Sequence, residues 1–296
     1  MRRTRWWIER LQRDHPTHWQ AIARAGAAQA PMVLRVNQRR SSRLACLQAL
    51  LLAGIEAQPL GDAGIVLTHP LPVSQIPGFS EGLLSVQDGA AQLAAPLLLQ
   101  GFARPQDLNV LDACAAPGGK TAHLLELGAG RVTALDVDPT RCGRIRQNLQ
   151  RLQLEASVLA ADAGEPAGWW DSQAFDAILL DAPCTASGIV RRHPDIPWMR
   201  RKQDVGQLAA QQLRLLNTLW PLLKRGGRLL FCTCSVFREE GSEQVRAFAA
   251  NNTDAALLPS PGHLLPRNWA DADAVPDNEP RDHDGFFYAL LEKRPT

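Results

Sequence analysis

The sequence predicts an α/β fold, in which a doubly wound, Rossmann-like parallel sheet follows a small N-terminal α/β domain. From Asn109 onward, short apolar runs alternate with helical segments, as in repeated strand–helix units. Of the 296 residues, 45% are hydrophobic and 21% are charged, which is typical of a globular chain and excludes a disordered one. This length favours about two domains, and we place them at residues 1–78 and 79–296.

The N-terminal part alternates between helix and strand patterns. The expected elements are helices over 5–25 and 42–53 and strands at 33–36 and 65–67. Gly54 closes the second helix. Prolines and glycines between residues 70 and 78 mark the domain boundary, and a helix over 85–99 is expected to open the larger domain.

The larger domain repeats strand and helix in turn. The expected strands cover 110–113, 132–136, 157–160, 177–181, 229–232 and 286–291. The expected helices are one that ends at 127 and two over 139–152 and 204–223. This order predicts a parallel sheet with helices on both faces. The aspartate-rich segment 270–284, which contains two prolines, is expected to be an exposed loop.

Positive charge is concentrated at the start of the chain. Residues 1–43 carry a balance of +8 in a chain of net charge +2, so the remainder carries −6. The ten arginines responsible are at positions 2, 3, 5, 10, 13, 24, 35, 39, 40 and 43. The asymmetry fits either an anionic partner or a solvated basic helix and strand edge.

The six cysteines are expected to be reduced. The arginine-rich start lacks the apolar segment of a secretory signal, and no stretch approaches the ~18 apolar residues of a membrane span. We therefore expect a cytoplasmic protein whose cysteines are core residues, ligands or catalysts. Cys46 and Cys142 have helix-like neighbours and are expected to be core residues.

Acidic residues and glycines stand where the predicted strands end. The run Asp112–Lys120 follows the first strand, and Asp136, Asp162 and Asp181 end the next three. In open α/β sheets, ligands bind beyond these carboxyl ends. A carboxylate 18 residues after Gly118 suits a ribose hydroxyl pair, and Asp162 suits an adenine edge. The set favours a nucleotide-type cofactor site over four separate helix caps.

A phosphate-binding loop is the competing interpretation. Gly119-Lys120-Thr121 is similar to the end of a P-loop, but that motif requires a glycine five positions before Gly119, where Cys114 stands. Because of this mismatch, a nucleotide hydrolase is the minor hypothesis. Binding of ATP would support the hydrolase.

Two cysteines follow neighbouring predicted strands. Cys184 follows the fourth strand, after Pro183, and Cys234 follows the fifth, within Thr233-Cys234-Ser235. Adjacent strands would bring both thiols into one pocket, and a thiolate is a strong nucleophile. A metal site that includes Cys232 lacks a histidine or fourth cysteine at ligand spacing, so we expect no metal. A disulfide conflicts with a reducing compartment, and Cys232 is expected to be a core residue.

The motifs resemble those of the Sun/Nop2 family of RNA cytosine-C5 methyltransferases, in its bacterial small-subunit rRNA branch. The resemblance covers nearly the whole chain in order, and the pairing of Pro-Cys with Thr-Cys-Ser is highly specific. The matching motifs are Pro31–Asn37, Val86–Asp88, Asp112–Lys120, Asp181–Cys184, Arg191–Ile196, Thr233–Ser235 and Asp284–Phe287. Members of this branch carry an additional helical N-terminal domain that resembles the antitermination factor NusB, so a truncated or naturally short form is expected here. Two smaller departures, Ala113 and Cys232, are expected to be neutral.

The resemblance implies S-adenosyl-L-methionine as cofactor and a covalent mechanism. A cysteine thiolate adds to carbon 6 of cytosine, carbon 5 takes the methyl group, and loss of the carbon-5 proton expels the thiolate. The family pattern implies Cys234 as the nucleophile, Cys184 for release of the adduct, Asp181 at the cytosine edge and Lys120 as an active-site cation. DNA cytosine methyltransferases use the Pro-Cys cysteine, here Cys184, as the nucleophile. The implied cofactor contacts are Cys114, Ala115, Ala116, Pro117, Gly118, Gly119, Lys120, Asp136, Asp162 and Asp181.

The resemblance also implies an RNA partner, with 16S rRNA first and tRNA as an alternative, and an RRM-like small domain that binds it. The expected RNA contacts are Arg35, Arg191, Arg192, His193, Arg200 and Arg201, joined by Lys202. A solvated basic helix end is the alternative for the segment after Cys184. A non-catalytic, cofactor-binding rRNA assembly factor is the alternative function. We expect a monomer without a membrane partner.

Overall fold

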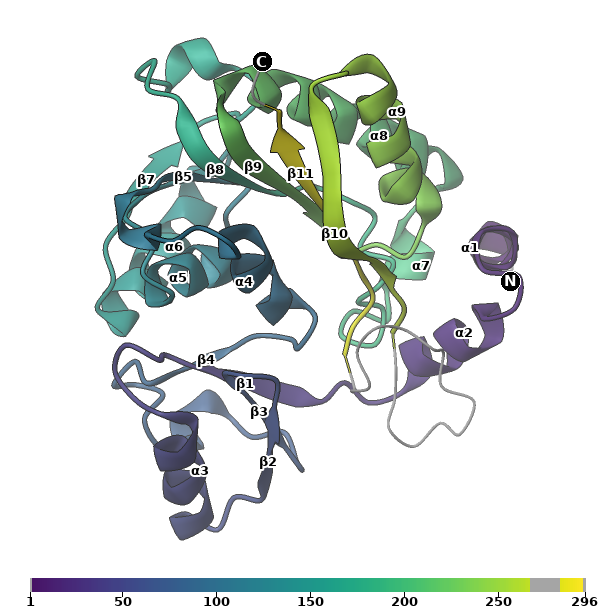
Figure 1. Cartoon of the computed structure of the whole chain (residues 1–296). Helices are drawn as coiled ribbons and strands as arrows, with labels where there is room; N and C mark the ends of the chain where they lie inside the picture. The colour runs from purple at the N-terminus through teal and green to yellow at the C-terminus, as the bar shows by residue number, and fades with distance from the viewer. Residues whose placement is uncertain (1, 267–282, 295–296) are drawn as a thin grey trace.

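The computed structural model describes residues 2–266 and 283–294. Within these residues the chain forms a four-stranded sheet near the N-terminus and a seven-stranded sheet after it (Figure 1). None of the described helices has both the length and the apolar character that crossing a membrane requires.

The small sheet is antiparallel, with the strand order β2-β3-β1-β4. Its strands are β1 (Met32–Val36), β2 (Ala57–Leu60), β3 (Gly64–Leu67) and β4 (Leu84–Val86). Helix α3 (Arg43–Leu52) begins where the Ser42 hydroxyl accepts a hydrogen bond from the Ala45 N–H. Leu50 of this helix packs in one core with Ile65 and Leu84. The strands predicted at 33–36 and 65–67 and the helix over 42–53 are confirmed.

The predicted helix over 85–99 is wrong in its first half. Residues 84–86 form β4, which pairs with β1, and a 3₁₀ turn (Ala91–Leu93) precedes the short helix α4 (Ala94–Leu99). Pairing with β1 decides the conformation, because tertiary contacts override a weak local pattern. Strand β4 belongs to the small sheet although it follows residue 78, and the division into domains at that residue stays a prediction.

The predicted helix over 5–25 is interrupted at residues 15–18. Helix α1 (Arg2–Asp14) ends before Pro16, which lacks an N–H and cannot continue the helical bonding, and helix α2 (Trp19–Ala27) starts anew. Trp7 of α1 packs against Phe237, with ring centroids 4.9 Å apart. Figure 1 shows α1 and α2 beside α7 (Ile196–Met199), away from the small sheet. The apolar face of these helices therefore packs on the larger domain.

The large sheet has the strand order β10-β11-β9-β8-β5-β6-β7. From β9 to β7 neighbouring strands are parallel, whereas β11 and β10 are added antiparallel at one edge. The strands are β5 (Asn109–Ala113), β6 (Arg131–Asp136), β7 (Ser157–Ala160), β8 (Phe175–Asp181), β9 (Leu223–Thr233), β10 (Ala255–Leu264) and β11 (Phe286–Lys293). The predicted doubly wound sheet is confirmed, and the antiparallel edge is an addition to it.

Helices cover both faces of the large sheet. Helices α4, α5 (Gly119–Glu126) and α6 (Pro139–Leu152) pack on one face, and α8 (Lys202–Leu219) and α9 (Ser242–Asn251) on the other. Alternate strand residues supply the two cores, as Val110 and Leu111 do. Helix α8 ends before the predicted residue 223, because a 3₁₀ turn (Trp220–Leu222) leads directly into β9. Helix α9 and strand β10 are not among the predicted elements.

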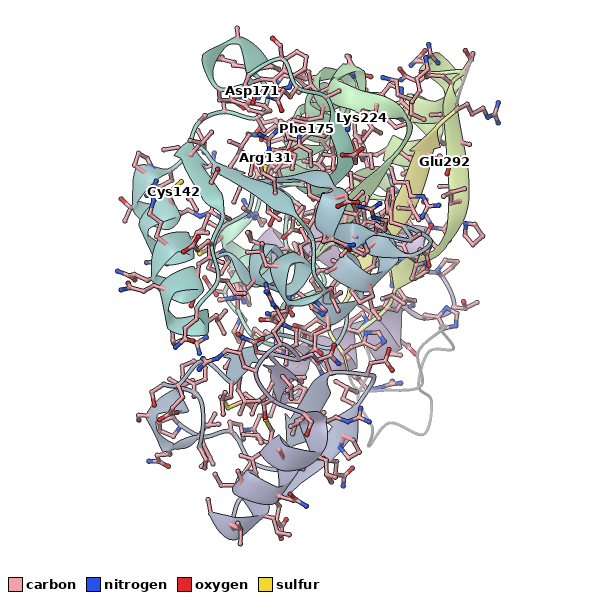
Figure 2. All side chains as sticks on the ribbon, turned by 60° about the vertical axis from the view of Figure 1, so that its left-hand side comes forward. Arg131, Cys142, Asp171, Phe175, Lys224 and Glu292 are labelled. Atoms are coloured by element: carbon pink, nitrogen blue, oxygen red, sulfur yellow. The ribbon has the colours of Figure 1, made fainter. Side chains whose placement is uncertain are left out.

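The carboxyl ends of the parallel strands face the small sheet. Arg131, Phe175 and Lys224, at or next to the starts of β6, β8 and β9, lie at the end of the molecule far from the small sheet (Figure 2). Lys224 is ion-paired there with Asp176, at 2.7 Å. Ligands bound beyond the strand ends would therefore lie on the side of the small domain.

Candidate active site

A cavity of about 600 Å³ opens beyond the carboxyl ends of the parallel strands. Strand β5 is the switch point of the sheet, because β6 lies on one side of it and β8 on the other, and ligands of such sheets bind there. The predicted site residues that line the cavity are Cys114, Ala116, Pro117, Asp136, Asp162, Asp181, Cys184, His193 and Cys234. The structure thus brings the loop after β5 and both cysteines to one cavity.

The loop between β5 and α5 depends on glycine at one position. Gly118 has a φ of 95°, and a Cβ there would lie 3.0 Å from Cγ2 of Ile145 on α6. Helix α5 starts at Gly119, so its first N–H groups have no partner within the helix. Ala115, Gly118, Gly119 and Lys120 are not among the lining residues.

Two of the aspartates in this region shape the loop. Asp112 is fully buried and accepts a hydrogen bond from Oγ1 of Thr121 at 2.6 Å, and burial raises its pKa to about 7. Asp136 accepts the N–H groups of Ala116 at 3.2 Å and of Asp138 at 3.1 Å. Asp136 therefore fixes the loop in addition to lining the cavity.

The cavity wall around β6 and β7 fits the nucleoside part of a cofactor. Asp136 and Asp162 supply carboxylates, the acceptors that ribose hydroxyls and amino groups need, and Asp162 is ion-paired with Arg214 at 3.0 Å. Val137 also lines the cavity and is 67% exposed. An exposed apolar side chain that lines the same cavity as two carboxylates suits an aromatic base. Val137 is not among the site residues predicted from the sequence, although it directly follows the carboxylate at the strand end.

The two predicted cysteines meet at the ends of β8 and β9. Their Sγ atoms are 3.4 Å apart, a hydrogen-bonding distance in which either thiol can donate. The hydrogen bond with Cys234 is the largest cause, and burial the second, of a pKa for Cys184 well above its ordinary range. Burial also raises the pKa of the Cys114 thiol, to about 12. No group of histidines, cysteines and carboxylates able to hold a metal gathers among residues 2–266 and 283–294.

Lys120 and Asp181 form an ion pair at the end of β8. The Nζ–Oδ2 distance is 2.6 Å, and the Lys120 side chain is 12% exposed. Burial acts to lower the pKa of Lys120, but the charge of Asp181 and the hydrogen bond between them raise it above its ordinary value. Lys120 is therefore a permanent cation that orients the carboxylate on the cavity wall.

Arg35, predicted as an RNA contact, is fully buried. Its Nε and Nη2 bind both carboxylate oxygens of Glu126 at 2.9 and 2.8 Å, and its Nη1 binds the carbonyl oxygen of Gly119 at 2.8 Å. A side chain without exposed surface cannot reach a phosphate, so the prediction is wrong. Arg35 instead connects β1 of the small sheet to both ends of α5, at Gly119 and Glu126.

Arg191 is also buried, and the Arg192 guanidinium is ion-paired with two carboxylates. Nε of Arg191 is ion-paired with Asp284 at 2.6 Å, and Arg192 pairs with Asp284 and, at 2.9 Å, with Asp88. Three sequence motifs therefore meet in one ion cluster, and Arg191 is not an RNA contact. The loop expected over 270–284 falls outside the described residues up to 282, and His283 and Asp284 are buried rather than exposed.

The other residues of the predicted basic segment differ in exposure: Arg200 is partly buried, and His193, Arg201 and Lys202 are exposed. Arg200 donates to the carbonyl oxygens of Cys184 and Thr185, both at 3.3 Å, and so supports the cysteine loop. His193 is exposed and lines the cavity. Arg201 and Lys202 are exposed. Arg192 and Arg200 are partly exposed, so Arg192, His193, Arg200, Arg201 and Lys202 remain the predicted RNA contacts of this segment.

The strand order and the loop at β5 define a Rossmann-like methyltransferase fold, which solved structures share. A methyltransferase homologue protein from Pyrococcus horikoshii is 29% identical, with a TM-score of 0.79 over 96% of this chain and 93% of that chain. NSun6 from Pyrococcus horikoshii with SFG has a TM-score of 0.82 at 19% identity, over 98% of both chains, which shows a common fold.

The chain belongs to the RsmB/F family of 16S rRNA methyltransferases, whose model matches residues 102–292. The ferredoxin-like domain of the RsmF/B-like methyltransferases matches residues 4–74. Ribosomal RNA small subunit methyltransferase B of Vibrio cholerae and that of Salmonella arizonae are each 44% identical over 98% of this chain. The chain spans 65% and 66% of the length of these relatives. The family predicted from the motifs is confirmed.

Proposed function

We propose that the chain transfers a methyl group from S-adenosylmethionine to carbon 5 of a cytosine in 16S rRNA, through a covalent bond between a cysteine and carbon 6. The observation that carries the proposal is the pair of sulfur atoms 3.4 Å apart on the wall of the cavity that Asp181 also lines. The rRNA substrate is supported by the family and by relatives named for the small ribosomal subunit.

The cofactor supplies an electrophilic methyl group. The lining residues that would hold it are Cys114, Ala116 and Pro117 of the loop after β5, the carboxylates of Asp136 and Asp162, and Val137 against the base. These residues follow β5, β6 and β7, whereas the two cysteines follow β8 and β9. The cavity therefore offers neighbouring places for the methyl donor and for the cytosine.

The chain's own residues would make carbon 5 nucleophilic. The Cys234 thiolate forms a bond to carbon 6, and the electrons of the 5,6 double bond move through carbons 5 and 4 onto ring nitrogen 3. Nitrogen 3 takes up a proton from water, and the Asp181 carboxylate stabilises the resulting N–H by accepting its hydrogen bond. Carbon 5 then forms its bond to the methyl group as the bond between that methyl group and the donor sulfur breaks, which leaves a thioether. Loss of the carbon-5 proton to water restores the 5,6 double bond and expels the Cys234 thiolate, and nitrogen 3 gives its proton back to water.

The environment of Cys184 supports this division of roles. Only a thiolate attacks, and the raised pKa of Cys184 disfavours its thiolate form. With the family motifs, this supports Cys234 as the nucleophile and Cys184 for release of the adduct, in which it acts beside the departing sulfur. The charge of Lys120 fixes Asp181 at the cytosine edge.

The cytosine must leave its stack to enter the cavity. His193 at the wall and the exposed Arg201 and Lys202 would contact the flanking phosphates. The same chemistry on tRNA and a non-catalytic role in rRNA assembly are the alternatives.

Methyl transfer to unmodified 16S rRNA tests the proposal. With labelled S-adenosylmethionine we expect 5-methylcytidine in the product, no turnover by C234A, and unchanged turnover by C46A, whose cysteine lies in the core of the small domain. Methylation of tRNA instead of 16S rRNA would favour the first alternative. Cofactor binding without transfer to any RNA would favour the second.

A further inference from the structure

Glu240 lies buried where the two cysteine loops meet, and no step of the proposed mechanism uses it. Oε1 accepts the N–H of Thr185 at 2.8 Å, and Oε2 accepts the Thr185 hydroxyl and, at 2.7 Å, the Ser235 hydroxyl. Thr185 directly follows Cys184, and Ser235 directly follows Cys234. One carboxylate therefore holds both loops.

Further hydrogen bonds fix the same junction. The hydroxyls of Ser187 and Ser235 are 2.8 Å apart, and the Gly188 N–H donates to the Cys234 carbonyl oxygen at 2.9 Å. Thr233 Oγ1 donates to the carbonyl oxygen of Glu240 at 3.1 Å. A shift of Glu240 would therefore move the backbone that carries both sulfur atoms.

The charges at the junction act on one another. Burial raises the pKa of Glu240, while the hydroxyl and N–H donors and the charge of Arg200 lower it. The charge of Glu240 in turn adds to the hydrogen bond and the burial that raise the pKa of Cys184. An anionic Glu240 thus favours the thiol form of Cys184.

We propose that Glu240 is a positioning residue that sets the spacing of the Cys184 and Cys234 sulfurs. Its catalytic consequence rests on the proposed function, because release of the adduct requires both sulfurs at one base. The spacing itself is a property of the chain and can be measured without RNA. A displacement of about 1 Å in such a site costs on the order of 10²-fold in rate.

The test compares E240A and E240Q with Q244A as the matched control. Gln244 is a buried residue whose amide donates to the Ala209 carbonyl oxygen at 2.7 Å, with no hydrogen bond to either cysteine loop. The first readout is the rate at which dibromobimane bridges the two thiols, since this reagent fluoresces only when both arms react; C184S gives the background. The second is kcat, measured beside the Kd of S-adenosylmethionine.

For E240A we expect bridging to slow about 10-fold and kcat to fall about 10²-fold, with cofactor Kd within about twofold. E240Q keeps the shape and an acceptor for the Thr185 N–H, so it should recover most of the bridging rate. If E240A does not fold, E240D, one methylene shorter, replaces it. Wild-type bridging in E240A, or equal slowing in Q244A, would overturn the proposal. A chain that bridges normally but methylates no RNA would refute the proposed function alone.

Discussion

Replacing Arg35 by methionine is predicted to cost about 3–5 kcal/mol of folding free energy. The Arg35 side chain is 0% exposed and that of Glu126 is 2% exposed, with the two charged groups joined by two hydrogen bonds. The substitution leaves the Glu126 charge buried without its cation, and it removes a donor from the Gly119 carbonyl oxygen. An uncompensated buried charge costs far more than the loss of an exposed ion pair.

Urea unfolding of R35M and of R35M/E126M measures this cost. The double variant should regain most of the lost stability, because an apolar pair carries no desolvation penalty. Burial raises the pKa of Glu126 and Arg35 opposes that rise, so in R35M the folded state binds the proton at higher pH than the unfolded state. The deficit of R35M should therefore shrink as the pH falls. A deficit under about 1 kcal/mol, or a double variant no more stable than the single one, would refute the reasoning.

Three further perturbations follow from the site. G118A should weaken cofactor binding about 10-fold by calorimetry, because a φ of 95° strains alanine by about 1–2 kcal/mol and its Cβ meets Ile145; unchanged affinity would contradict the tight loop. Burial raises the pKa of Asp112 to about 7, so the free energy of unfolding of the wild type should fall by up to ~1.4 kcal/mol for each unit by which the pH rises between about pH 4 and 7. D112N should lose this slope; parallel stability–pH curves for the two proteins would contradict the raised pKa. Mild oxidation should join Cys184 and Cys234, whose sulfurs must close from 3.4 Å to about 2.05 Å, with loss of two hydrogens by mass spectrometry and reversal by dithiothreitol; disulfides only at other cysteines would contradict the geometry.

Features carried by strand ends were predictable from the sequence. Asp136 and Asp181 end apolar strands and Cys234 directly follows one, and parallel strands bring such residues to one edge of the sheet. The same logic placed Cys184 and Cys234 in one pocket, and their sulfur atoms lie 3.4 Å apart.

Features that depend on contacts distant in sequence were not predictable. The sequence pattern around Arg35 indicates a charged residue in a strand. It is the same whether that residue faces solvent or pairs with a carboxylate 91 positions away. Glu240 binds a residue 55 positions earlier, and no spacing rule indicates that pairing. The helix expected over 85–99 gave way to β4 because a partner strand from residues 32–36 was available.

The central claim is that two cysteines divide attack and release between them. Incubation of C184A and C234A with 16S rRNA and S-adenosylmethionine, followed by denaturing electrophoresis, tests it directly. We predict that C184A accumulates a covalent protein–RNA complex, because the adduct forms but is not released, and that C234A forms none. A covalent complex with C234A and none with C184A would contradict the assignment.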